Sequence, residues 1–127
     1  MFMGKTTDDL RLIGFEPVVG TEPRVLILGS MPSEASLAAG CYYAHPRNRF
    51  WRVVGECFGF DPTLPYKERL DALEASGAAL WDTIESCERT GSLDSAILRP
   101  QVNDFSAFFA AHPTICLLYT SDAADEE

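Results

Sequence analysis

The pattern of apolar and polar positions predicts strands that alternate with helices. Residues 25–28 (VLIL) form an apolar run without alternation, which is typical of a strand buried on both faces of a parallel sheet. Residues 78–81 (AALW) form a second such run, and a third begins at residues 114–115. Residues 1–23 are a polar lead-in whose glycines and prolines exclude a long regular element.

Four helices are expected between these runs. Pro32 can open a short helix over 33–39, and Pro46 a second one that Gly59 stops. In the second helix the apolar positions fall on one arc, with Arg49 and Arg52 on the other side. These apolar positions are Phe50, Val53, Val54, Cys57 and Phe58.

The remaining helices are expected at residues 66–76, ended by Gly77, and at 104–111, with Phe105, Phe108 and Phe109 facing inward. A polar loop should follow Asp82 and run through residues 85–95. The alternation predicts an α/β fold with right-handed crossovers.

The last residues do not fit this pattern. The segment 116–127 (CLLYTSDAADEE) has no periodicity and resembles translated sequencing-adapter read-through. We therefore expect one domain over residues 1–115, incomplete at its C-terminal end, and a non-native or disordered tail over 116–127. An ordinary frayed acidic terminus is the alternative.

Composition and charge narrow the function classes. The chain has 127 residues, 46% of them hydrophobic, as expected for one globular domain. The formal net charge of −9 argues against a nucleic-acid partner, but Arg47, Arg49 and Arg52 cluster locally. No apolar run is long enough to span a membrane, and no N-terminal signal segment is present, so we expect a cytoplasmic, intracellular protein of prokaryotic type and a monomer.

The four cysteines are widely spaced and include no Cys-x-x-Cys pair. This spacing favours reduced, mostly buried thiols over a zinc or iron–sulfur site, and we expect neither a metal nor another cofactor.

The chemistry-bearing residues gather in residues 24–52. A loop that leaves the carboxyl end of a central parallel strand is where open α/β folds bind ligands, and Gly29 to Ser33 (GSMPS) form such a loop. Tyr42 and Tyr43 offer flat faces for stacking on a base. Phe50 and Trp51 are expected in the core.

Basic and amide side chains follow the tyrosines. The arginines at 47, 49 and 52 can hold phosphates, although they could equally form a solvated face. His45 and Asn48 add a titratable ring and an amide, although either could simply cap the helix.

The segment GSMPSEASLAAGCYYAHPRNRFW resembles the first active-site motif of the uracil-DNA glycosylase superfamily, most closely its hypoxanthine-DNA glycosylase branch. The similarity runs from about Gly14 to Ile115 and includes LWDTIESCERTGSLDSAI. It implies a three-layer α/β/α sandwich with a mainly parallel sheet in the order 2-1-3-4, here without its last strand and helix.

The resemblance also implies roles for individual residues. Relatives carry an asparagine in the strand-one loop that positions the attacking water, whereas this chain has Met31 there. The resemblance moves that amide to Asn48, with His45 as a possible aid to the leaving group, and places Tyr43 on the extruded base. Base-binding residues are then Gly29, Ser30, Met31, Pro32 and Tyr43, and DNA-backbone contacts are Ser33, Arg47, Arg49 and Arg52.

The implied activity is hydrolysis of the N-glycosidic bond of a deaminated base in DNA: hypoxanthine, uracil or xanthine. Loop N–H groups near Ser30 and Met31 would stabilise charge on the departing base. No candidate for the family's second motif, a loop that wedges the duplex open, follows Ile115. We therefore expect weak DNA affinity and little or no activity.

Two other classes stay open. The same loop could belong to a non-catalytic nucleic-acid- or nucleotide-binding module. Alternatively, Cys41 activated by His45 could be the nucleophile of a cysteine hydrolase.

Overall fold

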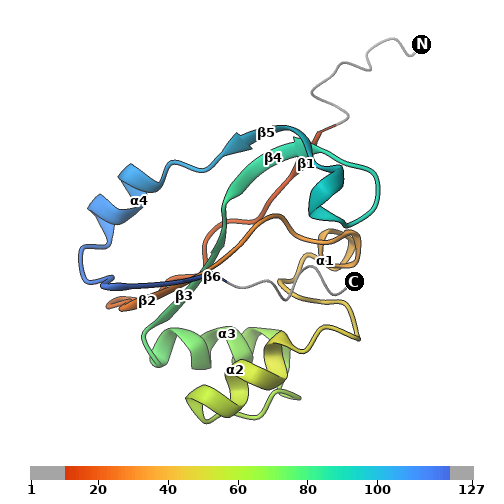
Figure 1. The fold of residues 1–127 in the computed structure, drawn as a ribbon. Helices are drawn as coiled ribbons and strands as arrows, with labels where there is room; N and C mark the ends of the chain where they lie inside the picture. Colours follow the sequence, from red (N-terminus) through yellow and green to blue (C-terminus); the bar gives the residue numbers. More distant parts are fainter. Residues whose placement is uncertain (1–10, 121–127) are drawn as a thin grey trace.

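The computed structural model describes residues 11–120, and Figure 1 shows their arrangement. These residues form two three-stranded sheets, four short α-helices, one 3-10 turn and their connections. In chain order these elements are β1 (Leu12–Ile13), β2 (Val25–Gly29), α1 (Glu34–Ala39), α2 (Phe50–Phe58), α3 (Tyr66–Ala75), β3 (Ala78–Asp82), β4 (Ile84–Glu88), the 3-10 turn η2 (Asp94–Ala96), β5 (Leu98–Val102), α4 (Phe105–Ala111) and β6 (Leu117–Thr120).

The central sheet is parallel, in the order β3-β2-β6. This agrees with the expected order 2-1-3 for its strands. The register pairs Val25 with Ala78 at one end and Gly29 with Asp82 at the other. Both strands therefore end at the same edge of the sheet, and the GSMPS loop begins there.

Alternate residues of the central strands face two different helical layers. Ile27 and Leu80 pack into a core with α2 and α3. Leu26 and Ala79 pack into a smaller core against Phe108 of α4. Figure 1 shows α2 and α3 on one side of the sheet and α4 on the other. The expected α/β/α sandwich with a parallel sheet is confirmed.

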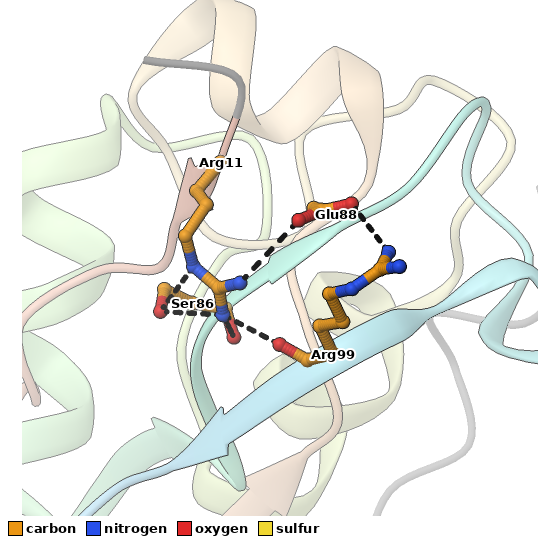
Figure 2. Close-up of polar contacts among 4 residues, drawn as sticks. All are labelled: Arg11, Ser86, Glu88 and Arg99. Atoms are coloured by element: carbon orange, nitrogen blue, oxygen red, sulfur yellow. Dashed lines mark hydrogen bonds and ion pairs between the residues drawn. The ribbon is translucent and has the colours of Figure 1, made fainter. Parts of the chain in front are cut away.

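The second sheet is antiparallel, in the order β1-β4-β5. The prediction of a polar loop over 85–95 is therefore wrong for residues 85–88, which lie in β4. Only Thr83 separates β3 from β4. A bridging side chain, Arg11, donates hydrogen bonds to the Ser86 carbonyl and hydroxyl of β4 and to the Arg99 carbonyl of β5 (Figure 2). Glu88 pairs with the Arg99 guanidinium at 2.9 Å.

The helix boundaries agree well with the sequence for α1, α3 and α4 and less well for α2. The expected start at Pro46 is wrong, because α2 begins at Phe50. Val53 and Cys57 are exposed, so the expected buried arc is wrong at these two positions. In α4, Phe108 is buried but Phe109 is 38% exposed. In both α2 and α4, fewer apolar side chains are buried than the sequence pattern predicted.

The third strand of the central sheet lies later than expected. Residues 113–114 form a turn, residues 115–116 have no regular structure, and β6 begins at Leu117. This strand lies within residues 116–127, the segment predicted to be a non-native or disordered tail. At residues 117–120 that segment therefore has regular structure. Residues 121–127 lie outside the described residues. The domain boundary at residue 115, and a further strand and helix beyond it, stay predictions.

The cysteines are free thiols, but the expectation that most are buried is wrong. Cys87 is buried and Cys41 half-buried, whereas Cys57 and Cys116 are exposed. Among residues 11–120, no helix is long and apolar enough to cross a membrane.

Gly55 tests the packing of α2. Glycine to alanine in a helix ordinarily stabilises by about 1 kcal/mol, but here a Cβ would lie 2.7 Å from the Phe60 carbonyl oxygen. We expect Gly55→Ala to lower the free energy of unfolding by about 1–3 kcal/mol in urea denaturation. The exposed neighbour Glu56→Ala should change it by less than about 0.5 kcal/mol. A stabilised Gly55→Ala protein would contradict the packing described for α2.

Candidate functional site

The site lies where β2 and β3 end. The GSMPS loop turns away from the sheet at Gly29, and β3 ends at Asp82 beside it. A small pocket opens at this edge. We call it the strand-end pocket, and it is lined by Met31, Pro32, Ser33, Ser36, Tyr42, Tyr43 and Asp82.

Gly29 is required by its neighbours across the sheet. A Cβ at this position would lie 2.5 Å from Asp82 Oδ1 and 3.0 Å from the Tyr43 hydroxyl. Any larger side chain would therefore displace both groups. Gly29 thus makes room for two polar groups of the pocket, and its expected contact with the base stays a prediction.

Serine side chains hold the two halves of the motif together. Ser33 is 2% exposed, and its hydroxyl caps α1 by accepting from the Ser36 amide at 3.1 Å. The Ser36 hydroxyl accepts in turn from the Ala44 amide at 3.0 Å. The Ser33 side chain is thus engaged in the fold, and its expected contact with the DNA backbone stays a prediction.

Tyr42 and Tyr43 are buried rather than exposed for stacking on a base. Tyr42 donates a hydrogen bond to the Glu16 carbonyl, and its own carbonyl accepts from Trp51 Nε1. One ring face of Tyr43 is covered by Phe50, with centroids 3.8 Å apart and planes 16° apart. Tyr43 has a left-handed backbone (φ 54°), which places its ring in the pocket lining. The expectation that Phe50 and Trp51 lie in the core is confirmed.

The two residues assigned catalytic roles lie next to the pocket lining in sequence but are not part of it. Asn48 Oδ1 accepts from the Phe50 amide at 2.8 Å and so orders the start of α2. His45 Nδ1 accepts from the Arg47 amide at 3.1 Å. Cys41 Sγ contacts the Ala39 carbonyl, so Cys41 and His45 have different partners, which weakens the cysteine-hydrolase alternative.

The basic residues lie at the surface. Arg47, Arg49 and Arg52 are all exposed around the start of α2. This position is compatible with phosphate contacts, which stay predictions. Within the described part of the chain, no group of three or more His, Cys, Asp or Glu side chains could hold a metal ion.

Asp82 is an ionisable pocket residue that the sequence did not single out. Its side chain is 4% exposed, and among residues 11–120 its Oδ2 has no hydrogen-bond partner. Burial and, to a smaller extent, the negative charge of Asp94 raise the pKa of this carboxyl to about 7, against the opposing charge of Arg89. The position at the end of an apolar strand was the signal that could have found it.

A second missed feature is the segment 89–94, whose side chains form hydrogen bonds with the GSMPS loop. The Ser30 hydroxyl donates to Asp94 Oδ1 at 2.7 Å, and Arg89 Nη2 donates to the Pro32 carbonyl at 2.6 Å. The loop therefore depends on a segment far along the chain.

Comparisons with known proteins agree on one family. The family model described as the uracil DNA glycosylase superfamily matches residues 17–125. Two proteins named hypoxanthine DNA glycosylase, from Methanosarcina barkeri and Methanosarcina acetivorans, are each 37% identical over 106 residues. Each match covers 83% of this chain and 67% of the relative. A solution NMR structure of a candidate uracil DNA glycosylase from Methanosarcina acetivorans is 35% identical, with a TM-score of 0.79, over 91% of this chain and 73% of that one.

Replacing Asp82 with asparagine tests the buried carboxyl. The unfolded chain loses this proton near pH 3.8 and the folded chain near pH 7, so ionisation destabilises the fold increasingly between these values. We expect Asp82→Asn to raise the free energy of unfolding at pH 8 by up to about 4 kcal/mol. The gain should shrink as pH falls and vanish below about pH 4. Denaturant unfolding at several pH values measures it, and an equal effect at all pH values would contradict the raised pKa.

Proposed function

Because this chain belongs to the uracil DNA glycosylase superfamily, we propose that it hydrolyses the N-glycosidic bond of a deaminated base in DNA, with hypoxanthine as the first candidate. The relatives named hypoxanthine DNA glycosylase support this choice of base. The partner is then DNA that contains such a base, bound by a monomer.

The observation that carries the proposal is the buried carboxyl in an aromatic pocket. Hypoxanthine presents a lactam edge, with an N1–H donor beside an O6 acceptor. A neutral Asp82 has one O–H donor and one C=O acceptor, so it can pair with both. An ionised Asp82 has acceptors only and would repel O6. The raised pKa of Asp82 keeps the neutral form available near pH 7.

The base must leave the helix to reach such a pocket. Tyr43 and Met31 offer apolar lining for the extruded base. Phe50 covers one face of the Tyr43 ring, and Tyr43, which is 8% exposed, still belongs to the pocket lining. Arg47 and Arg52 are exposed around the start of α2, and in this proposal they neutralise phosphates of the bound strand.

The reaction breaks the bond between C1′ and the base nitrogen. The bonding electrons leave with the base, and water attacks C1′ and gives up a proton to the base or to solvent. Donors in the GSMPS loop would stabilise the charge on the base. We assign the orientation of the attacking water to Asn48. Its Oδ1 already accepts from Phe50, which holds the amide in one orientation.

Base release tests the function directly. With protein in excess over duplexes that contain deoxyinosine or deoxyuridine, we expect slow release of free base above the protein-free rate. The rate should fall as pH rises through about 7, as Asp82 ionises. Asp82→Asn has the same donor and acceptor without titration, so its rate should stay level across that range, and Asp82→Ala should abolish release. Salt-sensitive binding without any release would favour a non-catalytic nucleic-acid module instead.

Asn48 can be tested apart from its helix contact. Asn48→Ser keeps an oxygen that can accept from the Phe50 amide, whereas Asn48→Ala does not. We expect both variants to slow base release at least about tenfold, with thermal unfolding changed mainly in Asn48→Ala. Full base release by Asn48→Ser would remove Asn48 from the reaction.

A further inference from the structure

The segment 89–94 contacts three alternate positions of the GSMPS loop and the start of α1. Asp94 holds the Ser30 side chain, and Arg89 holds the Pro32 carbonyl. The Ser92 hydroxyl accepts from the Glu34 amide at 2.9 Å. All three contacts join residues that lie 57 to 64 positions apart in the sequence.

A loop of this kind needs such support. Fixing the backbone of one residue costs about 1–2 kcal/mol, and the five loop residues have little regular pairing of their own. Two backbone hydrogen bonds, from Thr83 to the Gly29 carbonyl and from Ile84 to the Ser30 carbonyl, anchor the beginning of the loop. Beyond Ser30, hydrogen bonds with residues 89–94 anchor the backbone at Pro32 and Glu34.

The burial of the Arg89 guanidinium costs folding free energy. Its Nε and Nη1 are buried without a hydrogen-bond partner among residues 11–120, while Nη2 donates to Pro32. A buried guanidinium with unsatisfied donors destabilises a fold, and only a group that accepts from those donors or pairs with the charge offsets this cost. Under the proposed function, such negative charge would develop on the departing base in the strand-end pocket, which the same loop bounds.

We propose that residues 89–94 form a clamp that fixes the GSMPS loop over the strand-end pocket, with Arg89 and Asp94 as positioning residues for base excision. The part that concerns excision rests on the proposed function. The part that concerns the loop stands on contacts alone.

The clamp also places two opposite charges near the pocket carboxyl. Asp94 raises the pKa of Asp82 and Arg89 lowers it. Two tyrosines also face Asp82. Burial raises the pKa of Tyr42 and the charge of Asp82 raises it further, and the Tyr43 hydroxyl lies on the same side of Gly29 as the Asp82 carboxyl. Removal of the Asp94 charge should therefore shift the pH profile of excision to lower pH, and removal of the Arg89 charge should shift it to higher pH.

Amide hydrogen exchange tests the clamp without reference to activity. We expect Ser92→Ala to speed exchange of the Glu34 amide at least tenfold, because that amide loses its acceptor. Arg89→Lys should speed exchange in residues 30–34 while the protein stays folded. The control Arg99→Lys changes an arginine of β5 that pairs with Glu88, away from the loop, and should leave residues 30–34 unchanged. Unchanged exchange of these amides in both clamp variants would overturn the clamp.

The pH profile tests the charges. The midpoint above which base release declines should move to lower pH in Asp94→Asn and to higher pH in Arg89→Met, whereas Arg89→Lys keeps the charge and should stay near the unaltered protein. General destabilisation cannot move the midpoint in two directions. Shifts in the same direction, or none, would overturn the positioning role. Absence of base release by the unaltered protein would instead overturn the proposed function, and hydrogen exchange would still decide the clamp.

Discussion

The parallel pairing of β2 with β3 is the constraint on which the site depends. Its register places Gly29 directly beside Asp82. Because Gly29 has no side chain, the Asp82 carboxyl and the Tyr43 hydroxyl can occupy the space above it. A shift of the register by one residue would place the carboxyl on the opposite face of the sheet. The pocket therefore follows from strand pairing, before any loop contact is considered.

The aromatic segment after α1 contributes to both the core and the pocket. Trp51 and Tyr42 join in the core through the indole N–H, and Arg69 lies over the Trp51 ring at 4.8 Å. Tyr43 is stacked on Phe50 within the same cluster and still reaches the pocket lining. A rigid core residue is a more precise wall for a ligand than a surface loop residue would be.

The first two strands of the central sheet and the helix over 66–76 could be predicted because their signals are local: unbroken apolar runs, a leading proline and a terminal glycine. The third strand was placed too early, because its run starts beyond the turn at 113–114. The antiparallel sheet could not be predicted, because β4 (IESCE) and β5 (LRPQV) contain no apolar run, and the Arg11 side chain that bridges them comes from more than seventy residues away. The start of α2 was misplaced because Asn48, rather than Pro46, orders its first turn. Phe50 and Trp51 were assigned correctly to the core, since burying a large aromatic side chain at the start of a helix strongly favours folding.

The candidate site could be predicted in its location but not in its polar members. The GSMPS loop was expected at the strand end and lies there. Asp82 and Arg89 were not found, because one polar residue after a strand looks the same in sequence whether it is solvated or buried. Both side chains have buried polar atoms without a hydrogen-bond partner among residues 11–120, which costs stability in the free protein. Arg69 Nε and Glu88 Oε2, away from the pocket, are in the same state. Buried unpartnered atoms therefore point to the site only together with their position at the strand ends, where a ligand could satisfy them.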